Sequence, residues 1–292
     1  MRHTRIVLGG LAPLAAIAVL GLPAADARLL AQARPAADSV LLERLRAYAA
    51  RYTEVMASVV ADERYEQYAT ASRAAPVTRR LRSEVVMLRL PGNPEPIWFR
   101  DVHEVDGRRV RDQEQRLYRL LESNAVGTLA HLRRIAAESA RYNLGRVPRT
   151  TNAPDVVFAY LTAGPGQISV EADRETEVGG VKVRVLRFRE IGSPTVVRGT
   201  SARDSPARGR LWVEPESGAL VRSEVILGDT ESSGITTVDF VSHARAPVRV
   251  PGRMEERYRA PGEVVVGTAT YTNLRIFGVV TSEQVRKPPG RR

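Results

Sequence analysis

The second half of this sequence is a succession of short apolar runs with strand-like spacing, separated by brief turns. The runs follow Gly164 and cover residues 167–172, 181–191, 208–213, 219–227, 234–242, 254–259 and 264–277. Connections this short join neighbouring strands in an antiparallel manner. The pattern therefore predicts an antiparallel β-sheet as the main element of the fold.

The first half mixes strands with helices. Strand-like runs cover residues 62–68, 79–90 and 97–105, and the Asp106-Gly107 dipeptide is a strong hairpin signal that leads into 108–111. Apolar residues recur with helical spacing over 40–60, 113–122, 128–143 and 155–162. No boundary divides this region from the strands that follow, so we expect one domain over residues 38–285.

Several strands are apolar on both faces, as where Val85 and Met87 oppose Val86 and Leu88. In a sheet with one solvent-exposed face, each strand would alternate regularly between apolar and polar residues. Either two sheets pack as a sandwich, or one curved sheet wraps around helices. Because a sandwich has no place for several amphipathic helices, we predict an α+β fold in which a curved antiparallel sheet, a half-barrel, surrounds a few helices.

The stretch GRLWVEPESGALVR, residues 209–222, has the features of a hairpin. Pro215 fixes its own φ, Glu216 and Ser217 suit a solvated turn, and Gly218 can adopt the positive φ that closes it. The stretch ATYTNLRIF, residues 269–277, has the character of a long final strand.

Both stretches resemble segments of LolA-like proteins, the periplasmic carriers of lipoproteins and their lipid-binding relatives. The likeness covers residues 38–281 at the level of pattern, although this chain is longer and has extra helical sequence between 113 and 143. The resemblance implies a half-barrel that binds an acyl chain, a lipid or a lipoprotein without catalysis. It transfers no functional residue, because the matching hairpin carries none.

The N-terminus has the features of a secretory signal peptide. A short basic start precedes an apolar stretch, residues 6–22, that is interrupted by glycines and Pro13. Small residues then suit cleavage after Ala27 or Ala33. We therefore expect a signal peptide over 1–27, a linker over 28–37 and a periplasmic location. The alternative is an uncleaved membrane anchor.

The chain has no cysteine and a formal net charge of +11. An exported fold without disulfides depends on its core alone. The positive charge favours an anionic membrane surface, an acidic polysaccharide or an acidic protein as partner over nucleic acid. The arginines are spread along the chain, however, and only the 286–292 tail, which we expect to be disordered, concentrates them. The charge could therefore reflect composition alone.

No motif points to a reaction. His103, His131 and His243 stand apart, without the spacing of a metal site. Glu63 with Glu66, and Glu255 with Glu256, form carboxylate pairs, but nearby arginines favour ion pairing over acid–base chemistry. We therefore expect no catalytic residue, metal or cofactor. A hydrolase assembled from distant residues is a third, weaker alternative.

The function hypothesis is thus an exported, non-catalytic protein that binds an acyl chain, a lipid or a lipidated protein in a half-barrel cavity. The alternative is an envelope scaffold that binds an acidic partner through surface arginines. The oligomeric state is not predicted. Large aromatic side chains on the strands are the candidates to line the cavity: Trp98, Phe99, Trp212, Phe240, Tyr271 and Phe277.

Overall fold

The computed structural model describes residues 24–57, 59–88, 97–110, 134–135, 137–147, 149, 154–197, 204–228 and 232–276. For residues 24–37 and for Leu88, Ile97, Trp98 and Ile276, only the backbone is described. The chain divides into two compact units, Met1–Ser39 and Val40–Arg292. The first unit contributes the beginning of helix α1, and the second contains the rest of α1 and the whole sheet.

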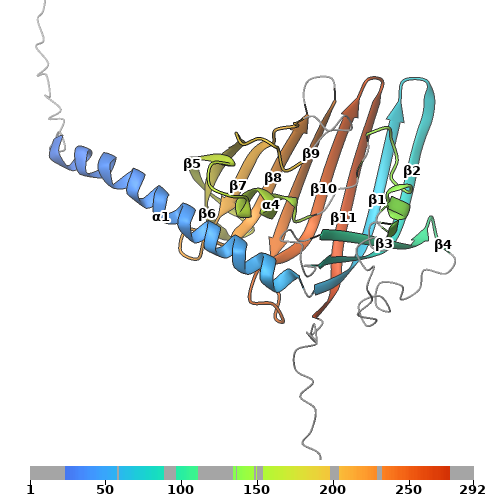
Figure 1. The fold of residues 1–292 in the computed structure, drawn as a ribbon, viewed down its shortest axis with the longest axis horizontal. Coiled ribbons are helices and arrows are strands. Elements are labelled where there is room, and N and C mark those ends of the chain that lie inside the picture. The colour runs from blue at the N-terminus through green and yellow to red at the C-terminus, as the bar shows by residue number, and fades with distance from the viewer. Residues whose placement is uncertain are drawn as a thin grey trace, which may run out of the picture. The chain divides into compact units, whose positions relative to one another are not determined.

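The second unit is built on one antiparallel sheet of 11 strands (Figure 1). The spatial order is β4-β3-β2-β1-β11-β10-β9-β8-β7-β6-β5, and the two edge strands do not pair, so the sheet is open rather than a closed barrel. The strands are β1 (Val59–Ala71), β2 (Ala74–Leu88), β3 (Ile97–Val105), β4 (Arg108–Arg109), β5 (Ile168–Val178), β6 (Val181–Glu190), β7 (Arg208–Val213), β8 (Leu220–Gly228), β9 (Ser233–Val241), β10 (Val250–Ala260) and β11 (Glu263–Ile276).

The sheet is a meander with one long-range junction. Strands that follow each other in the sequence are neighbours, except β4 and β5, which lie at the two opposite edges; the last strand, β11, pairs with the first, β1. This pairing runs from Val59 opposite Ile276 to Ala71 opposite Glu263. The strands nearest the two ends of the domain therefore meet in the interior of the sheet.

The described residues include two helices with complete bounds. Helix α1 spans Ala24–Met56 and α4 spans Val156–Thr162. The prediction for α1 began at residue 40, and the segment 28–37, expected as a linker, is helical. Helix α1 ends at Met56 and β1 begins at Val59. The β-branched pair Val59-Val60 favours the extended conformation there. No helix among the described residues is long and apolar enough to span a membrane.

The two faces of the sheet differ in what covers them. We call the face that packs against α4 and the second-unit part of α1 the inner face; it carries Ala61, Val85, Leu211 and Met254 of the main core. Val60 and Val86 lie opposite each other on β1 and β2, and cross-strand partners share a face. Neither residue belongs to the main core, so both lie on the opposite face of the sheet, which we call the outer face. The predicted fold class, an α+β curved antiparallel sheet, is confirmed.

The hairpin between β7 and β8 holds helix α1. Its turn closes through a hydrogen bond from the Gly218 N–H to the Glu214 carbonyl at 2.9 Å, and Gly218 has a φ of 70°. The Arg44 guanidinium of α1 donates to the Pro215 carbonyl at 2.8 Å. A Cβ on Gly218 would lie 2.5 Å from the Arg44 carbonyl carbon. Glycine is thus required both for the turn and for its contact with the helix.

The described residues include only part of the helices that were predicted in the middle of the chain. Residues 134–135 and 137–140 are helical, within the predicted 128–143. The predicted helix at 113–122, most of the signal peptide and the 286–292 tail lie outside the described residues. Ser139 lies near strand β3, where its hydroxyl oxygen accepts a hydrogen bond from the Val102 N–H at 3.4 Å.

Candidate functional site

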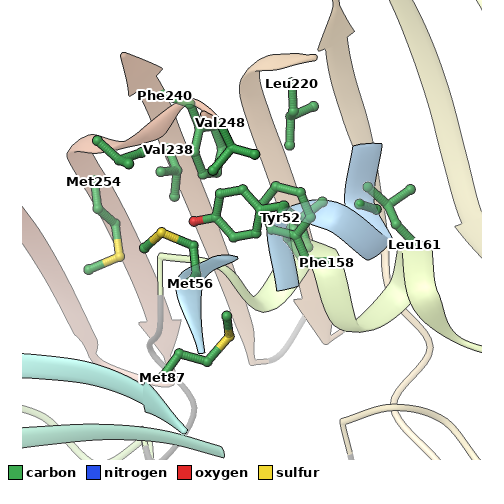
Figure 2. Packing of buried hydrophobic residues seen from close by; sticks show 14 of the residues in the cluster. Tyr52, Met56, Met87, Phe158, Leu161, Leu220, Val238, Phe240, Val248 and Met254 are labelled. Atoms are coloured by element: carbon green, nitrogen blue, oxygen red, sulfur yellow. The ribbon is translucent and has the colours of Figure 1, made fainter. Parts of the chain in front are cut away.

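The inner face below α1 and α4 is closed by an aromatic cluster (Figure 2). Tyr52 of α1 and Phe158 of α4 are stacked, with ring centroids 3.6 Å apart and an interplanar angle of 5°. Phe240 of β9 meets both rings edge-on, at 6.1 Å from Tyr52 and 5.6 Å from Phe158. Stacked and edge-to-face rings add to the burial energy. The cluster joins the two helices to the sheet.

Methionines occupy the adjacent part of this core. Met56 comes from α1, Met87 from β2 and Met254 from β10, and all three belong to the main buried cluster. Figure 2 shows their side chains directed toward the same part of the core. The Tyr271 hydroxyl lies 3.6 Å from the Met254 sulfur. Methionine is flexible and polarisable and adapts to irregular space, so this part of the core can repack most easily.

A small cavity lies beside these methionines. Its volume is about 10 Å³, roughly the space for one water molecule. The lining residues are Met56, Val59, Ala61, Val85, Pro154, Pro251, Tyr271 and Leu274. The wide cavity expected of a half-barrel is therefore not open beneath this part of α1; the helix and the methionines fill the space.

A buried carboxyl lies at the same end of the core. Asp155 immediately precedes α4, and its side chain is completely buried. Burial raises the pKa of Asp155 well above 3.8, and the nearby Tyr52 hydroxyl lowers it only in part. Among the described residues, neither the Asp155 oxygens nor the Tyr52 hydroxyl has a partner in hydrogen-bonding geometry. Such groups cost stability unless they are paired.

The other half of the inner face, on β1, β3, β10 and β11, contains a buried charge network. Its first part is Glu63, whose carboxylate accepts two hydrogen bonds from the Arg100 guanidinium, at 2.6 Å and 2.8 Å. The guanidinium carbon of Arg100 also lies 4.8 Å from the centroid of the Tyr65 ring. Both charges of this pair are therefore satisfied away from solvent.

The second part of the network centres on Glu256. Its carboxylate accepts hydrogen bonds from the Tyr65 hydroxyl at 2.6 Å and the Tyr258 hydroxyl at 2.7 Å. Arg149 donates to the Tyr65 hydroxyl oxygen at 2.8 Å and to the Gln67 side-chain oxygen at 2.7 Å. Burial, followed by the charge of Glu256, raises the pKa of Tyr65 and Tyr258 well above 10.0, so both remain donors.

This network binds strands rather than a ligand. Glu63, Arg100, Glu256 and Arg149 carry balanced charges, and each has partners within the protein. The ion-pairing interpretation of the carboxylate pairs is confirmed: Glu66 meets Arg80 at 3.4 Å and Glu255 meets Arg253 at 2.8 Å. No group of metal-binding side chains occurs in the parts of the chain that the structure describes.

The predicted ligand-binding residues do not gather at one site. Phe240 and Tyr271 lie in the inner core. Phe99 pairs with Val86 and so faces outward. Trp212 belongs to a separate outer cluster with Val183, Val185 and Val221. The side chain of Trp98 and the whole of Phe277 lie outside the described residues.

The site contains residues outside the predicted set, which was limited to aromatic side chains on strands. Tyr52, Met56, Phe158 and Asp155 come from or adjoin the helices. The apolar helical spacing over residues 40–60 contains Tyr52 and Met56 and is the signal for these two, because such a stripe marks the face of a helix that packs against the core.

No protein-family model matches the chain, and no curated relative does. The solved structures that are similar to it include the following three. A DUF1329 family protein from Desulfovibrio piger is 12% identical, with 82% of this chain and 95% of that chain covered and a TM-score of 0.33. A LolA superfamily protein from Nitrosomonas europaea is 13% identical, with coverages of 82% and 93% and a TM-score of 0.32.

The third is a domain named for outer membrane lipoprotein sorting, from Vibrio parahaemolyticus. It is 8% identical, with 80% of this chain and 93% of that chain covered and a TM-score of 0.36. The structural neighbours thus include the LolA superfamily, which the 209–222 hairpin resembles. The likeness is distant.

Proposed function

We propose that this is an exported envelope protein that binds the acyl chain of a lipid or lipidated protein, without catalysis, between α1 and the inner face. The observation that carries the proposal is the group of core methionines, Met56, Met87 and Met254, beside the 10 Å³ cavity that Met56 lines. The ligand site would be the space that these methionines occupy. Because it is nearly filled, the ligand must enter by displacing side chains and lifting α1. Methionines make this displacement less costly than branched side chains would.

The energetics permit such a mechanism. Burying a chain of about a dozen methylenes contributes roughly 10 kcal/mol before any cost is subtracted. That gain must exceed the cost of separating α1 from the sheet and immobilising the ligand. The buried Asp155 carboxyl lowers the stability of the closed form, because burial disfavours its charged state. It therefore reduces the energy needed to open it.

Among the described residues, polar contacts hold α1 against the sheet at places where it would have to yield. The Tyr48 hydroxyl oxygen accepts a hydrogen bond from the Arg249 N–H at 3.0 Å. Arg44 and Gly218 make the contact with the β7–β8 turn. This turn therefore acts as a latch on the helix, and weakening it should favour the open form.

Uptake of a fluorescent long-chain fatty acid by the full chain tests the proposal. Gly218→Ala forces the turn away from the helix backbone, so we expect uptake to be about tenfold faster, equivalent to roughly 1.4 kcal/mol in the opening equilibrium. Gly180→Ala is the matched control. Gly180 also has a positive φ, 82°, but a Cβ there would meet nothing within 4 Å.

Equal acceleration by both substitutions would show that uptake follows general destabilisation rather than release of α1. No uptake by the unmodified protein, together with native mass spectra free of lipid after purification from membranes, would overturn the proposal. A melting temperature measured for each variant confirms that uptake is compared between folded proteins.

A further inference from the structure

A groove of about 620 Å³ crosses the outer face of β5, β6, β7 and β8. Arginines are concentrated in it. Two adjacent rows of cross-strand neighbours form its floor, and each row has an arginine on β6 opposite an arginine on β7. The first row is Ser169, Arg189, Arg208 and Ile226, and the second row is Glu171, Arg187, Arg210 and Glu224.

The second row is neutralised within the protein. Arg210 makes two hydrogen bonds to the Glu224 carboxylate, both at 2.9 Å. Arg187 lies 3.6 Å from Glu171. Each arginine of this row thus has an acidic residue on the neighbouring strand. The second row shows how this sheet balances an arginine pair when nothing else binds it.

The first row lacks this balance. The positions that hold glutamates in the second row hold Ser169 and Ile226 here. Within the described part of the chain, no ion pair or hydrogen bond of the Arg189 or Arg208 guanidinium is found. Like charges directly opposite each other on neighbouring strands are destabilising. The arrangement is therefore unfavourable unless an external anion lies between the two side chains.

Apolar residues border the same row. Ile191, just after β6, lines the groove and is 60% exposed, the most exposed of the large hydrophobic side chains in the described residues. Ile226 adds partly exposed apolar surface next to Arg208. A soluble anion would gain nothing from these side chains, whereas a ligand with both an anionic group and apolar carbon would contact all of them.

We propose that Arg189 and Arg208 bind the phosphate group of an anionic phospholipid, and that this groove is the surface by which the protein contacts a membrane. The planar guanidinium fork suits two-point recognition of phosphate oxygens. The negative potential of an anionic leaflet favours the approach. Ile191 would enter the interface beside the headgroup. This site lies on the opposite face from the acyl-chain site and does not depend on it.

Sedimentation with vesicles tests this inference. The full chain is mixed with phosphatidylglycerol vesicles or with phosphatidylcholine vesicles at low salt. We expect preferential binding to phosphatidylglycerol and about a 30-fold loss of binding in Arg189→Gln/Arg208→Gln, the factor for two arginines at an anionic surface. Arg257→Gln/Arg259→Gln is the matched control, since it removes the same charge from exposed outer-face positions on β10. We expect less than a threefold change in that control.

Equal losses in the two double variants would overturn the inference, because they would indicate general charge attraction rather than a site. Equal binding of the unmodified protein to both vesicle types would overturn it as well. So would binding of soluble glycerol phosphate as tight as binding of vesicles, since the occupant would then not be a membrane lipid. All four arginines are exposed, so the variants are expected to fold, which circular dichroism checks.

Discussion

The two halves of the inner face are buried to a similar degree but are held together by different forces. Under α1 and α4 the contacts are rings and methionines, as in the Tyr52–Phe158 stack. On β1, β3, β10 and β11 the contacts are charges and hydroxyls, as in the Glu63–Arg100 pair. The apolar half depends on volume, and the charged half depends on each atom having its partner.

This difference separates a part that can change shape from a part that cannot. Apolar side chains of similar volume replace one another at small cost. A buried charge that loses its partner costs far more than the pair contributed. A ligand that displaces side chains must therefore enter the apolar half, while the charged half keeps the strands in register.

The largest effect is expected from Glu63→Gln. The substitution leaves the buried Arg100 guanidinium without its counter-charge, and we expect a loss of about 3–5 kcal/mol in the free energy of unfolding, measured by urea denaturation. Replacing both partners, as Glu63→Met/Arg100→Met, removes the unpaired charge as well. The double variant should recover most of the loss, and a double variant as unstable as the single one would contradict this interpretation.

A smaller, pH-dependent effect is expected at Asp155. Since its pKa is raised, the folded protein binds more protons than the unfolded chain above pH 3.8, and its stability falls as the pH rises through the window up to the raised pKa. Asp155→Asn removes this dependence. We expect the variant to be more stable than the parent by about 1–3 kcal/mol at pH 8.

The comparison between pH values supplies the control for Asp155. Near pH 4 the parent carboxyl is protonated in the folded state and about half protonated in the unfolded chain, so most of the stabilising effect of the asparagine should disappear. Thermal unfolding of both proteins at the two pH values measures it. An advantage that is the same at pH 4 and pH 8 would assign the effect to packing rather than to charge.

The smallest effect is expected from Met87→Leu in the apolar half. The two side chains have similar volume, so the free energy of unfolding should fall by less than about 1.5 kcal/mol. Urea denaturation under the conditions used for Glu63→Gln gives a direct comparison. A loss as large as that of Glu63→Gln would remove the distinction between an adaptable half and a fixed half.

Strand bounds were well predicted where the alternation of apolar residues and the positions of turn residues indicate the same strand ends. The predicted bounds of β3 and β7 are those observed. Strand β10 begins at Val250 rather than at residue 254, because Pro251 and Gly252 look like a turn in the sequence but lie at a register shift in the sheet. Strand β5 continues to Val178 through a polar segment that also contains a register shift.

The candidate site was harder to predict because residue type does not determine which face a side chain occupies. Phe99 and Trp212 are as apolar as Phe240, yet they lie on the outer face. The stack of Tyr52 on Phe158 joins helices far apart in the sequence, and no local pattern encodes it. Ion pairing of Glu63 was predictable, but its partner, Arg100, lies on another strand rather than beside it.

The pairing of β1 with β11 bears on when this protein can fold. Val59 must wait for Ile276 before its strand gains its second neighbour. Such a contact closes a very long loop, which is slow to form and requires almost the entire polypeptide. A chain whose last strand has not yet been synthesised therefore lacks the β1–β11 pairing in the interior of the sheet. The native state can therefore be reached only after the last strand has emerged.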